Sequence, residues 1–419
     1  MENDSENDVL CEKIINEIHA VFVKDTDLSS FAIVPTSADQ KNRSPVLHED
    51  HNLGLESWCA KPVYMYAHEQ ILALKLANRY CHSDSIIKYV NIALLINSDV
   101  TTFWHIRRVL VEKNKLELHR EFQFASLVLS VKPKSNEAFS YRRWLFSFRS
   151  YESIDWSFEI AICDRCGDRS SSNYHAWTHR EWVIQKAPHL LKSEIIMTEK
   201  FIKKHISDYS CYHYRQFILK KLYEIRYFDK EQDLKSLIEF INFYVIDHVT
   251  NTNDILDTLL PGVDLKKIDN NIIKSFLFCC NIAAYDIKFC DESKNFYGPF
   301  ESFDFHRRAS LKFIVDNCKE FTNNSRYMNH NHNNNEHIKN GNHKNKDNND
   351  DNQHDINGDI NNDETMEYEN QDHDLEEEPL NKVTKVENKF LLALKKSEGL
   401  LGEKHRRWCS IFLGFDYNQ

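Results

Sequence analysis

The chain has 419 residues, of which 41% are hydrophobic and 28% charged, so it can bury a sizeable core and is neither collagen-like nor wholly disordered. Its formal net charge of -11 argues against nonspecific nucleic-acid binding. Nine Gly and eight Pro are too few turn-forming residues for a sandwich or barrel of many short strands, so the composition predicts a mostly α-helical fold.

The N-terminal sequence and the cysteines indicate the compartment. The first residues, MENDSENDVLCEK, are acidic and lack the apolar core of a signal peptide, and the eleven cysteines form no regular framework. We therefore expect reduced thiols and a cytoplasmic location. The longest apolar stretch, Ser275 to Tyr285, is shorter than the roughly 20 residues of a membrane-spanning helix, so we expect a buried helix and no membrane span.

A repeated motif follows an N-terminal segment. We expect residues 1–60 to pack on the first hairpin of a repeat domain that covers residues 61–320. Four segments place an aromatic residue three positions before an arginine, and the arginines lie 35, 38 and 35 residues apart. A period of this length is typical of stacked supersecondary units. The pairs are Trp104 with Arg107, Phe139 with Arg142, Trp177 with Arg180, and Tyr212 with Arg215.

The spacing within the motif predicts one helical stripe. An apolar residue stands seven positions after each aromatic residue, and positions i, i+3 and i+7 share one face of a helix. We expect each arginine to be partly buried and to act as a clamp between helices, because its planar fork can stack on a ring and donate to carbonyls or carboxylates. The simplest interpretation of these side chains is structural.

A segment with apolar residues at helical spacing precedes each motif, so we predict that each unit is a helical hairpin. Such hairpins stack into a right-handed solenoid, and we predict an all-α fold, an α-α superhelix of five to six hairpins. A degenerate copy at Arg307 has Asp304 in the aromatic position, which leaves the role of that unit open. The preceding segments are Ser85–Leu95, Leu116–Val131, Trp156–Cys166 and Leu191–Ile206.

The composition of the C-terminal part predicts which of its segments are ordered. Residues 322–378 are rich in Asn, Asp and His and too poor in apolar residues to offset ordering entropy, which predicts a disordered insert without a defined metal site. Residues 381–419 resume helical periodicity and are predicted to form a closing helix. Cys163 and Cys166 form a lone CxxC, for which two buried thiols are favoured over a zinc or redox site.

The aromatic-arginine pattern resembles the repeat of the protein prenyltransferase alpha subunit family. The segment NYHAWTHREWVIQ, residues 173–185, is similar to the third repeat of farnesyltransferase and geranylgeranyltransferase alpha subunits. The segment NRSPVLHEDHNLGLESWC, residues 42–59, and HRRWCSIFL near the C-terminus resemble more narrowly the alpha-like subunit of a third geranylgeranyltransferase.

The resemblance implies a subunit that wraps around a beta-type partner of the Rab type. That partner would carry the zinc and the isoprenoid pocket, so no cofactor is expected in this chain. The pair would transfer a geranylgeranyl group from its diphosphate to a cysteine near the C-terminus of a substrate protein.

The same resemblance makes Lys134 the diphosphate contact and places Tyr174 and His175 on the diphosphate and substrate side. Without it, Lys134 reads as a solvated turn lysine, and Tyr174 and His175 as packing at a helix start. Two alternatives to an enzyme subunit stay open. One is a noncatalytic helical-repeat scaffold that binds a trafficking protein or peptide. The other is a protein that competes for the beta chain without supporting turnover.

Overall fold

The computed structural model describes residues 2–36, 42, 44–77, 85–149, 154–230, 237, 260 and 263–339. The chain divides into two compact units, residues 1–218 and residues 219–419. Helices dominate the described residues, with one small sheet, which confirms the predicted all-α class.

The first unit begins with a helix and a three-stranded sheet. Helix α1 (Glu2–Lys24) is followed by β1 (Ser30–Val34), β2 (Val46–Glu49) and β3 (Asn52–Glu56), in the order β1-β3-β2. Strand β1 pairs parallel with β3, and β2 pairs antiparallel with it. At the centre lies Gly54, where an added Cβ would meet Leu47 Cβ and Val34 Cγ2 at 3.2 Å each. The low Gly and Pro content did not predict this sheet, because strands of four or five residues need few turn-forming residues.

The N-terminal module, residues 2–56, is fastened by polar contacts. Asp25, just after α1, accepts hydrogen bonds from His48 Nε2 at 2.7 Å and His51 Nδ1 at 2.9 Å. Ser44 donates to Glu17 Oε1 at 2.6 Å, so the loop before β2 is also held by α1. The module packs through α1 against helices α2 (Ser57–Leu76) and α3 (Ser85–Ile96) and through β1 against helix α5 (Leu118–Val131).

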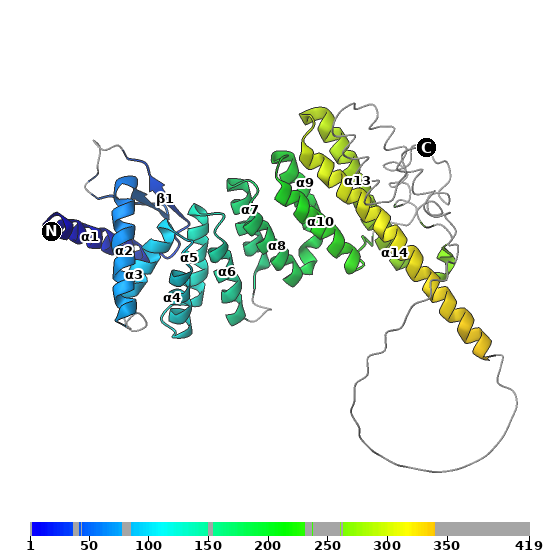
Figure 1. Ribbon diagram of the computed structural model, residues 1–419, viewed down its shortest axis with the longest axis horizontal. Coiled ribbons are helices and arrows are strands. Elements are labelled where there is room, and N and C mark those ends of the chain that lie inside the picture. Colours follow the sequence, from blue (N-terminus) through cyan, green and yellow to red (C-terminus); the bar gives the residue numbers. More distant parts are fainter. Residues whose placement is uncertain are drawn as a thin grey trace, which may run out of the picture. The chain divides into compact units, whose positions relative to one another are not determined.

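Helical hairpins make up the rest of the first unit, and the last of their helices continues past residue 218 (Figure 1). Helix α2 (Ser57–Leu76) precedes them, and each later hairpin pairs a first helix with a second one. The first helices coincide with the four predicted apolar segments to within a few residues. The hairpins are α3 (Ser85–Ile96) with α4 (Thr101–Glu112), α5 (Leu118–Val131) with α6 (Asn136–Leu145), α7 (Trp156–Arg169) with α8 (Tyr174–Lys186), and α9 (Leu191–Lys204) with α10 (Tyr209–Glu224). Short 3-10 turns, η1 (Phe146–Phe148) and η3 (Pro188–Leu190), lie between hairpins.

In the described part of the second unit, α13 (Asn270–Tyr297) packs against α14 (Glu301–Lys339), after the short turn η4 (Leu265–Lys267). The apolar stretch Ser275 to Tyr285 lies within α13 and buries Phe276, Leu277 and Cys280, so the predicted buried helix is confirmed. None of the helices in the described ranges is long and apolar enough to cross a membrane.

Helix α14 overlaps the start of the predicted insert. Its backbone continues to Lys339, so it includes residues 322–339 of the segment that composition predicted to be disordered. A helix started on a buried face can propagate by one hydrogen bond per residue, and no Gly or Pro occurs before Gly341 to end it. The rest of the insert and the predicted closing helix, residues 381–419, lie outside the described residues.

Candidate functional site

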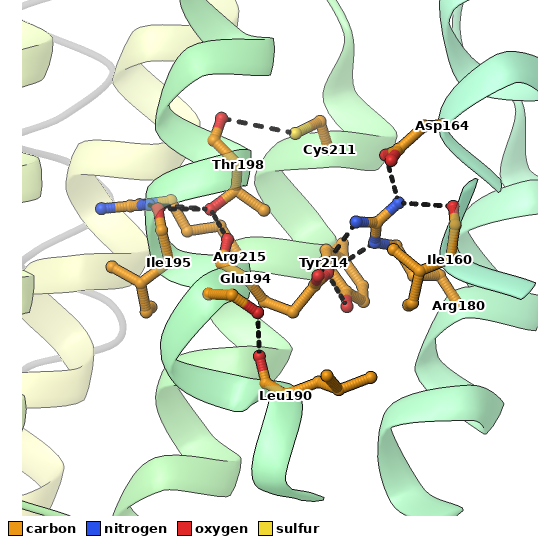
Figure 2. A network of polar contacts seen from close by, with 11 residues as sticks. Ile160, Asp164, Arg180, Leu190, Glu194, Ile195, Thr198, Cys211, Tyr214 and Arg215 are labelled. Carbon is orange, nitrogen blue, oxygen red and sulfur yellow. Dashed lines mark hydrogen bonds and ion pairs between the residues drawn. The ribbon is translucent and has the colours of Figure 1, made fainter. Parts of the chain in front are cut away.

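The repeat arginines are buried clamps, as the stripe predicted. Arg180 illustrates the geometry (Figure 2): its Nε and Nη2 donate to the two carboxylate oxygens of Glu194 on α9 at 2.5 and 3.0 Å. Its Nη1 donates to Asp164 on α7 at 2.5 Å, so one side chain on α8 joins three helices. Arg107 likewise grips Glu121 at 2.6 and 2.8 Å. Arg142 grips Glu159 in the same way.

Each of these glutamates is shared between two hairpins. Glu121 also accepts a hydrogen bond from Tyr141 at 2.6 Å, and Glu194 accepts one from Tyr214 at 2.6 Å. At the same position His179 Nε2 contacts Glu159 at 3.0 Å. We call this set the clamp ladder: Arg107, Glu121 and Tyr141; Arg142, Glu159 and His179; Arg180, Glu194 and Tyr214. In every rung the arginine comes from one hairpin, and the glutamate and its second donor come from the next.

Carboxylate partners for the arginines were expected, but the motif did not identify which residues they are. The sequence did contain a signal. In each of the three hairpins, the glutamate stands 20 positions before the residue that precedes the repeat arginine: Glu121 before Tyr141, Glu159 before His179 and Glu194 before Tyr214. The arginine-to-glutamate spacing is less regular, since it is 14 residues in two rungs and 17 in the rung of Arg142.

The electrostatics of the second rung fix its protonation. Burial alone would favour the neutral acid, but the charge of Arg142 and the hydrogen bonds from His179 and Arg142 lower the pKa of Glu159 to about 2. Burial lowers the pKa of His179 despite the nearby carboxylate. A neutral imidazole therefore donates its Nε2 hydrogen to Glu159, and its Nδ1 faces Arg143 Nη1 at 3.4 Å.

The α13–α14 hairpin of the second unit has the same register. Arg307 Nε donates to Asp291 at 3.1 Å, sixteen residues earlier, as Arg180 does to Asp164. His306 Nε2 lies 3.2 Å from Asp286, twenty residues earlier. Asp304, which left the role of this unit open, forms an ion pair with Lys294 of α13. The degenerate copy is therefore a repeat hairpin in which an ion pair replaces ring packing.

The second feature of the repeats is the edge where first helices turn into second helices. We call the turns 132–135, 170–173 and 205–208, with the first residues of the helices that follow, the turn edge. Each turn ends in a buried polar residue that caps the next helix. Ser135 accepts from Ala138 N at 3.2 Å. Asn173 accepts from Ala176 N at 3.1 Å. Asp208 accepts from Ser210 N at 3.0 Å.

Two of these capping residues also reach back to the preceding turn. Asn173 Nδ2 donates to the carbonyl of Pro133 at 2.6 Å, and Asp208 Oδ2 accepts from Ser172 N at 3.0 Å. Successive turns are therefore tied to one another by buried side chains. The roles of Asn173 and Asp208 were not predicted. A signal was present in the sequence, because Ser135, Asn173 and Asp208 each stand seven positions before a repeat arginine.

The predicted site residues lie on this turn edge. Lys134 is exposed in the turn before α6. Tyr174 is 66% exposed and His175 half-buried at the start of α8, with ring centroids 5.7 Å apart. Asn173, adjacent to Tyr174, bonds the residue before Lys134, so the edge brings the three predicted residues onto two directly linked turns.

The hydrogen bond from Asn173 to the Pro133 carbonyl also explains why the second repeat can have Phe139 in the aromatic position. Trp104 and Tyr212 donate to the carbonyl six residues earlier, at 2.8 and 3.1 Å. Phe139 has no donor, and the carbonyl six residues before it, that of Pro133, accepts from Asn173 instead. A hydrogen bond from the next hairpin thus replaces the one that an indole or phenol would supply.

The CxxC pair consists of two buried thiols. Burial raises the pKa of Cys163 well above its usual value and that of Cys166 to about 11, which disfavours the reactive thiolate form. Among the described residues, no group of three or more His, Cys, Asp or Glu side chains could hold a metal ion.

Three of the hairpins match a known repeat. The protein prenyltransferase alpha subunit repeat matches residues 118–149, 156–187 and 191–222, which are the hairpins α5–α6, α7–α8 and α9–α10. The chain is therefore built on the protein prenyltransferase alpha subunit repeat, and the resemblance seen in the sequence is confirmed. The hairpins α3–α4 and α13–α14 fall outside the matched ranges but keep the arginine geometry.

Several curated proteins are similar to this chain. The chain is 29% identical over 246 residues to protein prenyltransferase alpha subunit repeat-containing protein 1 of Danio rerio, covering 53% of this chain and 58% of that one. The protein of the same name in Homo sapiens is 30% identical over 245 residues, covering 53% and 61%. Geranylgeranyl transferase type-2 subunit alpha of Rattus norvegicus is 28% identical over 149 residues, covering 33% and 26%. The chain thus spans somewhat more than half the length of the first two relatives.

Proposed function

We propose that this chain is the alpha-type subunit of a heterodimeric protein prenyltransferase. It would support geranylgeranyl transfer from the diphosphate to a C-terminal cysteine of a substrate protein in the cytoplasm. The observation that carries the proposal is the pair of linked turns with Lys134, Tyr174 and His175, within repeats of the prenyltransferase alpha subunit type. The similarity to a geranylgeranyl transferase alpha subunit supports the choice of isoprenoid.

The chemistry divides between two chains. A beta-type partner of the Rab type would hold the isoprenoid and a zinc ion, which activates the substrate thiolate. This chain contributes groups at its surface. The Lys134 ammonium stabilises the negative charge that develops on the departing diphosphate, and the Tyr174 hydroxyl and His175 ring line the same side. Both Lys134 and Tyr174 are exposed, as residues that meet ligand only across an interface must be.

The test is coexpression of the full chain with a Rab-type beta subunit, followed by single-turnover geranylgeranyl transfer to a panel of cysteine-tailed proteins. Lys134→Ala should form the complex normally but slow the transfer step by about 100-fold, the usual cost of removing one donor from a developing anion. The matched control is Lys132→Ala, which removes an exposed lysine of the same turn and should leave the rate unchanged.

Other outcomes separate the rivals. Failure of the wild-type chain to bind any beta subunit would overturn the enzyme hypothesis and favour a scaffold that holds a trafficking protein or peptide on its repeats. A stable complex without transfer to any substrate would favour a competitor for the beta chain. Normal turnover in Lys134→Ala would remove the lysine from the mechanism and leave the subunit assignment standing.

A further inference from the structure

The turn 170–173, which precedes the predicted site residues of α8, has a backbone unlike those of the other two turns of the turn edge. The turns 132–135 and 205–208 each close with a hydrogen bond from the N–H of the last residue to the carbonyl three residues earlier, at 3.0 Å in both. In the turn 170–173 the chain instead passes through Ser172 at φ 51°, in the left-handed region. That region is unfavourable for a residue with a Cβ atom, so surrounding contacts must hold Ser172 there.

One buried carboxylate holds Ser172 in this conformation. Asp208 is 1% exposed, and its Oδ2 accepts the Ser172 N–H at 3.0 Å. Its other oxygen, Oδ1, caps α10 by accepting from the N–H groups of Ser210 at 3.0 Å and Cys211 at 3.3 Å. Capping a helix requires one side-chain oxygen, so the second oxygen serves the neighbouring turn. Ser135, at the equivalent position of the α5–α6 hairpin, has a single side-chain oxygen, which caps α6.

The Ser172 carbonyl transmits this constraint to the start of α8. It accepts the Tyr174 N–H at 3.0 Å across Asn173, whose φ of -82° and ψ of 78° define an inverse γ-turn. The Tyr174 and His175 rings extend from the first turn of α8, and their centroids lie 5.7 Å apart. Because both residues directly follow this turn, a change in the Ser172 backbone conformation would move both rings.

We infer that Asp208 is a positioning residue for Tyr174 and His175. By holding Ser172 in the left-handed conformation, it sets how these two side chains face the diphosphate and the substrate. This inference rests on the proposed function, which gives the two side chains their role. Asp208 itself is buried and acts through the backbone. Small displacements of groups that orient a substrate slow a reaction strongly, even when the altered residue lies away from the reacting atoms.

The test uses the full chain coexpressed with a Rab-type beta subunit, and it measures single-turnover geranylgeranyl transfer. Asp208→Asn keeps one oxygen to cap α10, but its amide NH2 cannot accept a hydrogen bond from Ser172. We expect normal affinity for the beta subunit and a transfer step that is about 10-fold slower. Asp99→Asn, at an exposed position in the turn between α3 and α4, is the matched control and should leave the rate unchanged.

Two further measurements separate positioning from a loss of stability. Ser172→Gly in the Asp208→Asn protein should restore most of the rate, because glycine adopts the left-handed conformation without steric cost. In a protein with Tyr174→Ala and His175→Ala, Asp208→Asn should slow transfer by less than about 2-fold, because the side chains that it positions are gone. A purely structural role of Asp208 would slow transfer equally in both backgrounds.

Amide hydrogen exchange in the free chain tests the link without a partner. Asp208→Asn should speed the exchange of the Ser172 and Tyr174 N–H groups about 10-fold, because both hydrogen bonds then open more often. If Asp208→Asn does not fold, Ser172→Val replaces it in the transfer assay. That variant leaves the Asp208 cap intact, and its β-branched side chain disfavours a positive φ.

The outcomes distinguish this inference from the proposed function. If the wild type transfers the geranylgeranyl group and folded Asp208→Asn transfers it at the same rate, the inference alone is overturned. An equal slowing by Asp208→Asn in the protein that lacks the Tyr174 and His175 side chains also overturns the inference alone, and so does unchanged exchange of the Ser172 and Tyr174 N–H groups. If the wild type forms no complex or transfers nothing, the proposed function fails and the inference falls with it.

Discussion

Helix α8 carries Tyr174 and Arg180 six residues apart, and the two belong to different parts of the molecule. Arg180 is completely buried in the clamp ladder, whereas Tyr174 on the turn edge is 66% exposed. The ladder has almost the same composition in each hairpin, with an arginine, a glutamate and a tyrosine or histidine. The turn edge changes from hairpin to hairpin, with Lys134 at one turn and Tyr174 and His175 at the next. The repeat therefore keeps its interior constant and varies its edge, so we expect the functional residues at the edge.

The largest effect should follow from breaking the ladder at its second rung. Glu159→Ala leaves the buried Arg142 and His179 without their carboxylate, and we expect it to lower the free energy of unfolding by about 3 to 5 kcal/mol in urea titrations. Glu117→Ala, which removes a glutamate side chain that is 75% exposed, should change it by less than about 0.5 kcal/mol. A loss below about 1 kcal/mol for Glu159→Ala would contradict the shared-clamp interpretation.

A smaller effect should follow from breaking the turn edge without disturbing the ladder. Asn173→Asp keeps an oxygen to cap α8 but cannot donate to the carbonyls of Pro133 and Cys166, so we expect a loss of about 1 to 3 kcal/mol in thermal unfolding. Asn136→Asp, at an exposed position of α6, is the control. If the proposed function holds, Asn173→Asp should also slow prenyl transfer, because the turn of Lys134 loses its anchor. Equal stability of the two variants would show that the link is dispensable.

The smallest effect should be a pH dependence of the free energy of unfolding. It should come from the rung of His179, because the neighbouring rungs have a tyrosine at that position. Burial lowers the pKa of His179 in the folded state, so the unfolded chain binds more protons as pH falls through about 6.5 and stability declines, by at most about 1.4 kcal/mol per pH unit. His179→Tyr copies Tyr141 and Tyr214 at the same register and should abolish this slope between about pH 5 and 7. Urea midpoints measured for both proteins across that pH range check this prediction. If the variant keeps the slope of stability against pH, another titrating group causes it.

The sequence predicted the parts of the fold that repeat. The aromatic-arginine spacing of three and the apolar position at seven fix a helical face, so the helices and the buried arginines followed from local pattern. The glutamate partners did not, because a carboxylate 14 or 17 residues away lies on another helix and many other acidic residues compete for the assignment. The parallel pairing in the sheet could not be predicted from local pattern, because it joins distant residues: β1 pairs with β3, and Ser30 lies opposite Asn52.

The candidate site was predicted by likeness rather than by physics. Nothing in the local pattern distinguishes Lys134 from Lys132, which is exposed in the same turn. The link that gives Lys134 a defined position is the bond from Asn173 to Pro133, forty residues earlier, and it becomes visible only when two hairpins are packed together.

The shared glutamates also bear on how this chain unfolds. When one hairpin unfolds, the preceding hairpin's arginine loses its carboxylate partner. Unfolding an internal hairpin therefore costs the packing energy of that hairpin and also leaves a buried charge uncompensated in its neighbour. In a one-dimensional Ising description, this is a strong coupling between neighbouring repeats. Such coupling favours unfolding that starts at the terminal hairpins over unfolding that starts at an internal hairpin. We expect amide exchange to be slowest in α5 to α8, where every hairpin has a rung on both sides.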